Sequence, residues 1–194
     1  MNALHLQLTQ WLAAGAQPTP WLLALASGLA MGGGWLAAAV MGWAAWRQPG
    51  QRTHICFMLA GAGLTALLCH AIAARLYLPR PFILGLVPAY IPHGASGAMP
   101  STHASAMFMV AFAFLARPAL RGPGAALFVL AAATGWARIH VGVHFPLDIA
   151  VGLMFGAFMA GVLGGAWRLV ELAMPRRLRR LGRRQRPLPL GPGG

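Results

Sequence analysis

Residues 21–46 read WLLALASGLAMGGGWLAAAVMGWAAW, a stretch without one charged side chain. Pro18 and Pro20 precede it, and Arg47 follows it. A transmembrane helix needs about 20 consecutive apolar residues, so this stretch is long enough to cross a bilayer as a helix. It predicts a membrane protein built from helices.

Four further apolar runs extend this prediction along the chain, at residues 55–74, 101–116, 124–137 and 146–167. The runs 101–116 and 124–137 would reach only about 20 to 24 Å as helices, so one end of each is expected to lie below the headgroups unless flanking residues lengthen it. The predicted fold class is all-α: a polytopic membrane helical bundle with about five transmembrane helices.

The first 17 residues contain no charged side chain but carry large apolar residues at helical spacing: Leu4, Leu8, Trp11 and Leu12. This pattern predicts a short N-terminal helix that lies in the membrane interface. A signal peptide is the alternative, but no Lys or Arg occurs before Arg47 to form its basic region.

The composition agrees with a membrane protein and excludes an ordinary soluble domain. Of 194 residues, 58% are hydrophobic and only 9% are charged, where a soluble domain would have about a quarter. The net charge of +13 does not indicate nucleic acid binding, because eight of the fifteen arginines lie between Arg168 and Arg186, after the last apolar run. We expect one membrane-embedded domain over residues 1–174 and a flexible, arginine-rich cytoplasmic tail over residues 175–194.

The arginines also predict the orientation of the bundle. Five spans place twelve arginines on one side and three, Arg75, Arg80 and Arg138, on the other. Cytoplasmic loops are enriched in Lys and Arg, so the C-terminus is predicted to lie inside and the N-terminus outside. The outer face then also holds His93, His103, His140 and His144.

Arginines, histidines and one carboxylate on the same face form a set suited to phosphate chemistry. Arginine binds phosphoryl oxygens, and histidine can attack phosphorus or transfer a proton. Asp148 follows His144 by four residues on a helix predicted to begin near Pro146, so its carboxylate can turn toward the imidazole and orient it. Asp148 is one of only two acids in the chain, and an acid at a membrane helix is usually functional.

Three segments carry a family resemblance: RLYLPRP (75–81), PSTH (100–103) and RIHVGVHFPLD (138–148). In order and spacing they resemble the three motifs of the phosphatidic acid phosphatase type 2 family, Lys-x6-Arg-Pro, Pro-Ser-Gly-His and Ser-Arg-x5-His-x3-Asp. The resemblance covers about residues 70–165. It implies a helical bundle shared with the vanadium haloperoxidases, although this chain lacks their soluble character.

The resemblance implies a role for each residue at a motif position. His144 would be the nucleophile that forms a phosphohistidine, Asp148 its orienting partner and His103 the acid that protonates the leaving group. The phosphoryl oxygens would be bound by Arg80, Arg138, Ser101 and Thr102. No metal and no cofactor is implied.

The chain departs from the family motifs at three positions. Ala73 stands where the family has lysine, Thr102 where it has glycine, and Ala137 where it has serine. Arg75 is near the lysine position but about 200° away around a helix. It is expected either to contact the phosphate that stays on the lipid or to anchor the helix in the headgroups.

Wider strings such as PRPF (79–82) and GWARIHVGVHFPLD (135–148) resemble one branch of the family, the bacterial undecaprenyl-diphosphate phosphatases linked to bacitracin resistance. That branch implies removal of the terminal phosphate of undecaprenyl diphosphate at the outer face of the bacterial inner membrane. The partners would be a polyprenyl or other lipid phosphate and membrane lipids, and not nucleic acid. The alternatives are another lipid phosphate substrate (phosphatidic acid, phosphatidylglycerol phosphate or lipid A) or a non-enzymatic anion-binding membrane protein.

Several remaining features have simple structural interpretations. Packing or interfacial hydrogen bonding is the default for His54 and His70. His93 and His140 share the outer face but stand at no motif position, so packing is expected for them and contact with the substrate is the alternative. Glycine pairs four residues apart (Gly28/Gly32, Gly152/Gly156 and Gly161/Gly165) predict close helix packing. Tryptophans near the span ends (Trp21, Trp43, Trp46 and Trp167) are typical of the membrane interface. The long apolar connection 82–99 either packs in the interface or caps the lipid site.

Overall fold

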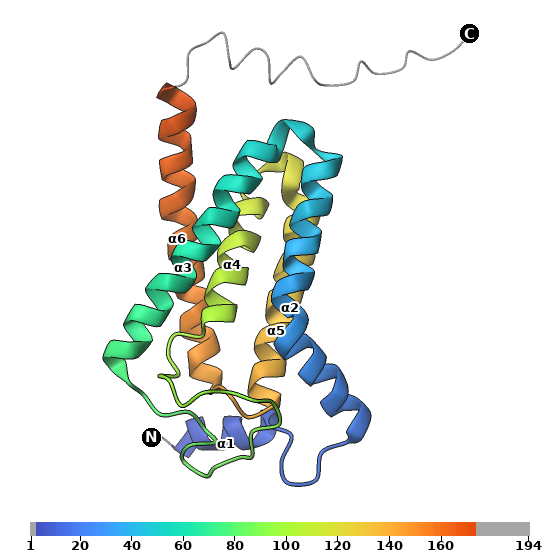
Figure 1. The fold of residues 1–194 in the computed structure, drawn as a ribbon, viewed down its shortest axis with the longest axis vertical. Helices are drawn as coiled ribbons and strands as arrows, with labels where there is room; N and C mark the ends of the chain where they lie inside the picture. The colour runs from blue at the N-terminus through green and yellow to red at the C-terminus, as the bar shows by residue number, and fades with distance from the viewer. Residues whose placement is uncertain (1–2, 174–194) are drawn as a thin grey trace, which may run out of the picture.

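A computed structural model describes residues 3–173 of the chain. The arginine-rich tail predicted for residues 175–194 lies outside the described residues. All regular elements within the described part are helices, which confirms the all-α fold class (Figure 1). They are α1 (Ala3–Leu12), α2 (Pro20–Arg47), α3 (Arg52–Leu76), α4 (Thr102–Leu115), α5 (Arg121–His140) and α6 (Pro146–Ala173), with short 3-10 turns η1 (Pro49–Gln51) and η2 (Pro118–Leu120).

Helices α2 to α6 run alternately up and down, so the connections fall at two ends of one bundle (Figure 1). In the described part of the chain, three segments are long and apolar enough to cross a membrane: Pro20–Arg47, Pro49–Leu76 and Pro146–Ala173. The other two helices of the predicted five are the 14-residue α4, which is a shorter apolar helix, and the 20-residue α5.

Helix α5 is longer than the predicted run 124–137, because a charge-free run is a poor guide to where a helix ends. Arg138 continues the helix with only 4% of its surface exposed and donates from Nη1 to the Ala30 carbonyl of α2 at 3.0 Å. Arg121 is the first residue of α5 and lies exposed at the opposite end. The helix therefore begins and ends with charged residues that a search for apolar runs excludes.

Helix α4 lies in the centre of the bundle and packs against α3, α5 and α6. Its contact with α6 depends on two glycines of α6. A Cβ on Gly156 would lie 2.6 Å from the Ser105 carbonyl oxygen, and one on Gly152 would lie 2.9 Å from the Ala104 Cβ. Close packing is thus confirmed for this pair. It is not found at Gly28/Gly32 or Gly161/Gly165, where an added Cβ would meet nothing within 4 Å in the described chain.

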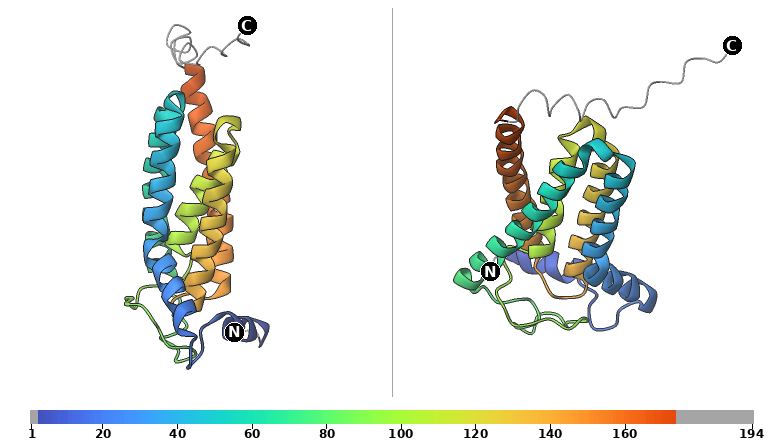
Figure 2. Two further views of the ribbon diagram at one scale, coloured as in Figure 1. Left: turned by 90° about the vertical axis from the view of Figure 1, so that its right-hand side faces the viewer. Right: turned by 45° about the horizontal axis from the view of Figure 1, so that its top comes forward.

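The N-terminal helix α1 lies across one end of the bundle (Figure 2). The Ala14 amide donates to the His140 carbonyl at 2.9 Å, and His140 Nδ1 lies 2.9 Å from the Leu12 carbonyl oxygen. Because a carbonyl only accepts, that imidazole nitrogen is the donor. His140 therefore has the packing role expected of it, at the junction of α1 and α5.

Three of the four tryptophans expected at the membrane interface are exposed, as that position requires. Trp21, Trp43 and Trp46 are 68%, 52% and 69% exposed. The prediction is wrong for Trp167, which is 7% exposed. Its indole donates to Glu171 Oε1 at 2.6 Å, so this side chain has a polar partner inside the protein and does not need the interface.

Candidate active site

Two loops at the α1 end of the bundle bring the motif residues together. The loop between α3 and α4, residues 77–101, packs against the loop between α5 and α6, residues 141–145. Gly142 allows this contact: its φ is +80°, and a Cβ there would lie 2.1 Å from the Pro88 carbonyl oxygen. Gly97 lies equally close to α3, with its Cβ position 2.2 Å from the Ala73 carbonyl oxygen. Only glycine fits at either position.

A cavity of about 610 Å³ lies where these loops meet α3, α4 and α5. Motif residues from all three segments line it: Arg80, Pro100, Thr102, His103, Arg138 and His144. Its other walls are formed by His70, Ala73, Ala74, Tyr77, His93, Ser96 and Gly97. The long connection 82–99 therefore supplies part of the cavity wall.

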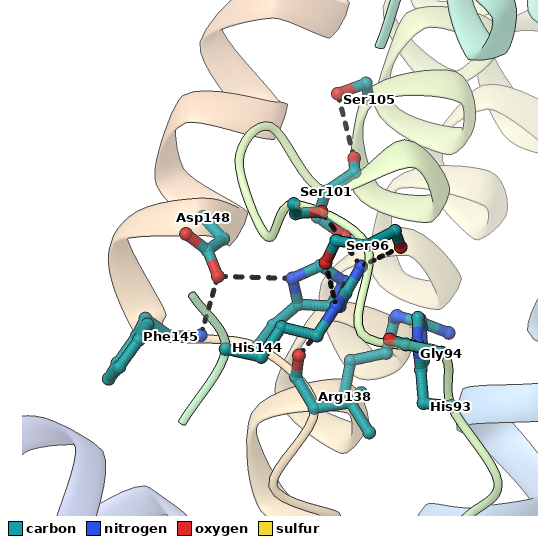
Figure 3. Close-up of polar contacts among 12 residues, drawn as sticks. His93, Gly94, Ser96, Ser101, Ser105, Arg138, His144, Phe145 and Asp148 are labelled. Carbon is teal, nitrogen blue, oxygen red and sulfur yellow. Dashed lines mark hydrogen bonds and ion pairs between the residues drawn. The ribbon is translucent and has the colours of Figure 1, made fainter. Parts of the chain in front are cut away.

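His144 and Asp148 form a buried pair behind the cavity (Figure 3). Each is 2% exposed. Asp148 Oδ2 accepts from the Phe145 amide at 2.8 Å and lies 3.2 Å from His144 Nδ1. Helix α6 begins at Pro146, so Asp148 sits in its first turn, where a carboxylate is favoured by free amide groups.

Arg80 lies on the cavity side of the same imidazole. Its guanidinium donates to the carbonyls of Ser96, Val143 and Gly97 at 2.9, 2.9 and 3.0 Å, which fix its orientation. Its Nη1 is also 3.2 Å from His144 Nε2. Arginine only donates, so His144 Nε2 accepts and Nδ1 carries the proton that is shared with Asp148. The tautomer of His144 therefore places the lone pair of Nε2 at the cavity, where it accepts from Arg80.

Arg138 is held by a histidine that belongs to no motif. Its Nη2 lies 2.8 Å from His93 Nε2 (Figure 3). By the same reasoning Nε2 of His93 accepts, and its Nδ1 donates to the Gly94 carbonyl at 3.2 Å. Two buried donors near this cluster have no hydrogen-bond partner within the described chain, the Arg138 Nε and the Ser101 hydroxyl. Arg138 lines the cavity, so its Nε is placed to donate to an oxygen of a ligand there.

The electrostatics favour an anionic ligand and a neutral His144 imidazole. Burial, followed by the charges of Arg138 and Arg80, lowers the pKa of His144 well below its ordinary value of 6.5. Burial and the charge of Arg80 also lower the pKa of His93. Two arginines face one carboxylate, so the site keeps a positive charge while both imidazoles stay neutral. Among residues 3–173, no three His, Cys, Asp or Glu side chains group as metal ligands, and the arginines supply the positive charge.

The structure does not bring every expected residue to the cavity wall. Thr102 and His103 line it, whereas Asp148 lies behind His144. Ser101 is completely buried beside Asp148, and its amide donates to the Asp148 carbonyl at 3.2 Å. Arg75 is exposed in the last turn of α3 and is not part of the cavity wall.

The sequence analysis assigned no site role to His70, Tyr77 or Ser96, and it placed His93 on the outer face without giving it a definite role. For His70 a signal was available. Ala73, at the family's lysine position, lines the cavity, and His70 precedes it by three residues on the same helical face. His93 and Ser96 lie in an irregular loop, where no periodicity relates position to direction.

Comparisons with known proteins agree with this geometry. Residues 53–170 match the model of the PAP2 superfamily. The chain is 32% identical over 126 residues to "Undecaprenyl-diphosphatase BcrC" of Bacillus subtilis (strain 168) and 38% identical over 85 residues to "Putative undecaprenyl-diphosphatase YbjG" of Escherichia coli (strain K12). These alignments cover 64% and 44% of this chain and span 62% and 40% of the lengths of those relatives.

Two crystal structures share the fold. Aquifex aeolicus LpxE superposes with a TM-score of 0.69 at 24% identity, covering 84% of this chain and 95% of its own. A transmembrane PAP2-type phosphatidylglycerolphosphate phosphatase from Bacillus subtilis gives 0.65 at 18% identity, covering 91% and 90%. These likenesses concern the fold alone. Because the family match extends over more than half of the sequence and includes all three motifs, the chain belongs to the PAP2 superfamily.

Proposed function

We propose that the protein is an integral membrane lipid phosphatase that removes the terminal phosphate of undecaprenyl diphosphate. The observation that carries the proposal is the state of His144: its Nε2 lone pair lies at a cavity that is also lined by two arginines and three further histidines, His103 among them. The names of the two curated relatives support the choice of substrate.

In the first step, His144 Nε2 attacks the terminal phosphorus, and the bond from phosphorus to the bridging oxygen breaks. Arg80 must first transfer its hydrogen bond from Nε2 to a phosphoryl oxygen, which frees the lone pair. Arg138 Nε and the Ser101 hydroxyl bind further oxygens as charge develops on them. Asp148 accepts from Nδ1–H and stabilises the positive charge that the imidazole gains.

His103 handles the proton in both steps. It lines the same cavity as His144 and donates a proton to the departing lipid phosphate. In the second step it removes a proton from the water that attacks the phosphohistidine, so that the N–P bond breaks and inorganic phosphate leaves. Arginines and histidines supply all the chemistry, and no divalent ion is needed.

We place the cavity at the outer face of the bacterial inner membrane. The twelve-to-three arginine split supports this orientation. The N-terminal helix and both site loops lie at the same end of the bundle (Figure 2), and residues of both loops line the cavity.

Parallel turnover of purified protein on undecaprenyl diphosphate and phosphatidic acid, both in EDTA, tests the proposal. We expect phosphate release from both and a larger kcat/KM on the diphosphate. A preference for phosphatidic acid would reassign the substrate within the family. No release from any lipid phosphate would favour the alternative of a non-enzymatic anion-binding protein.

A further inference from the structure

A second cavity, of about 300 Å³, lies at the opposite end of the bundle, between α3, α4 and α6. Helix α6 diverges from α3 toward this end in Figure 1 and in the right view of Figure 2. The polar residues that line the cavity are His54, Arg117, Arg168 and Glu171, and its remaining walls include Met58, Ala113, Ala160 and three glycines of α6. None of these residues takes part in the proposed phosphatase chemistry.

His54 shows that the cavity has unused hydrogen-bonding capacity. The side chain is buried, with 3% of the residue exposed, and neither ring nitrogen has a hydrogen-bond partner within the described chain. Its ring packs edge-on against Trp167, with centroids 5.1 Å apart. Buried polar groups in proteins are nearly always paired, so an imidazole that lines a cavity without partners points to a ligand.

The charges at this cavity favour an anion. Glu171 is already engaged, because it accepts from Arg117 and from the Trp167 indole. Arg117 also donates to Gln51 Oε1 at 2.7 Å, and its guanidinium lies 5.7 Å from the Trp167 ring. Arg168 is exposed and has no hydrogen bond or ion pair to residues 3–173. Arg117 and Arg168 therefore share the cavity with one carboxylate, that of Glu171. Arg117 is paired with it, and Arg168 remains unpaired within residues 3–173.

The glycines of α6 keep this space open. A Cβ on Gly152 or Gly156 would collide with α4, whereas Cβ atoms on Gly161, Gly164 and Gly165 would meet nothing within 4 Å. The last three glycines are therefore not explained by helix contact. From Ala160 to Glu171 the lining extends about 16 Å along α6, from small apolar residues deep in the bundle to charged residues at its end.

We propose that this cavity binds an anionic phospholipid of the leaflet opposite the active site. The phosphate group lies against Arg168, Arg117 and His54, and an acyl chain follows the glycine face of α6. A free phosphate ion would use only the charged end of the cavity and none of its apolar walls.

The proposal is tested by native mass spectrometry of the full-length protein exchanged from phosphatidylcholine into mixtures that contain phosphatidylglycerol. We expect the wild type to retain one phosphatidylglycerol selectively. Gly164→Leu, which fills the groove, and Arg168→Gln, which removes the free cation, should each weaken this binding about tenfold or more. Matched controls are Gly28→Leu, at another open helical glycine, and Arg121→Gln, at the same end but outside the cavity. Both should bind as the wild type does.

Two results would overturn the proposal. One is an equal loss of phosphatidylglycerol binding in Arg168→Gln and Arg121→Gln, which would indicate general attraction to the charged surface. The other is unchanged binding in both Gly164→Leu and Arg168→Gln. Displacement of the lipid by inorganic phosphate at the same concentration would exclude a lipid site. Arg168 is exposed, so its variant remains informative even if Gly164→Leu fails to fold. The readout does not use phosphatase activity, so it is independent of the proposed function.

Discussion

The two motif histidines differ in their surroundings, and this difference separates their proposed roles. His144 is enclosed between Asp148 and Arg80, whereas His103 is half-buried at the cavity wall and its ring forms no hydrogen bond within residues 3–173. A nucleophile is needed for every substrate. A general acid is needed only as much as the leaving group requires a proton.

This distinction predicts that the loss of activity depends on the leaving group in His103→Ala and does not depend on it in His144→Ala. His144→Ala should lose on the order of 10⁴-fold or more in kcat on all substrates, because no bond to phosphorus can form. His103→Ala should lose about 10² to 10⁴-fold on phosphatidic acid but far less on nitrophenyl phosphate, whose parent phenol has a pKa near 10 against about 16 for an alcohol. The measurement is kcat/KM across such a series, and a flat loss for His103→Ala that matches His144→Ala would refute the division of roles.

The environment of His144 also predicts its pH behaviour. Since burial and two arginines lower its pKa below 6.5, the folded protein keeps this imidazole neutral at pH 6.5, where an unshifted one would be half protonated. The unfolded chain binds the proton as the pH falls through 6.5 and the folded chain does not, so this group makes the fold less stable on acidification. NMR of protein labelled with ¹⁵N at histidine, assigned with His144→Asn, should show a neutral ring at pH 6.5. An imidazolium signal for His144 at that pH would contradict the electrostatic argument.

At the scale of elements, the contact between α4 and α6 positions both halves of the site. His103 lies in the first turn of α4 and Asp148 in the first turn of α6. In Gly156→Ala the new methyl would meet backbone atoms, the Ser105 oxygen at 2.6 Å and the Met109 nitrogen at 2.9 Å. The helices must move apart, so the free energy of unfolding should fall by about 1 to 3 kcal/mol.

Unfolding by SDS titration in micelles measures this effect. Gly28→Ala is the control, because its methyl meets nothing within 4 Å and reports only the gain in helix propensity. If the two variants have equal stability, the glycine contact does not hold α4 against α6.

The same elements show what sequence could and could not predict. Apolar runs predicted the helices because bilayer thickness sets their length, and the i, i+4 spacing of His144 and Asp148 predicted their pairing. The end of α5 was missed because Arg138 is buried against a backbone carbonyl, a contact that only tertiary structure creates. His93 was not assigned to the site for a similar reason: its contact with Arg138 joins residues 45 positions apart through an irregular loop.

At the scale of the whole molecule, the fold separates two chemically different ends. One end holds the site loops and α1, and the other holds η1, η2 and the described end of α6 (Figure 1). The orientation predicted from the arginines can be tested on intact cells, with single cysteines introduced at the exposed positions Ala95 and Ala119. Cys56 is exposed and Cys69 is buried, so both are first replaced.

We expect an impermeant thiol reagent to label position 95 and to leave position 119 unlabelled until the cells are opened. The reverse pattern would place the site loops in the cytoplasm and would remove the support for a role at the outer face.

The central claim is that phosphate passes through His144, and trapping the intermediate tests it most directly. His103→Ala slows the second step if that residue activates water, so rapid mixing with undecaprenyl diphosphate labelled in its terminal phosphate should produce a labelled protein. The label should be lost in acid and kept in alkali, as expected for phosphohistidine, and His103→Ala combined with His144→Ala should give none. An acid-stable label, or label that persists without His144, would contradict the account.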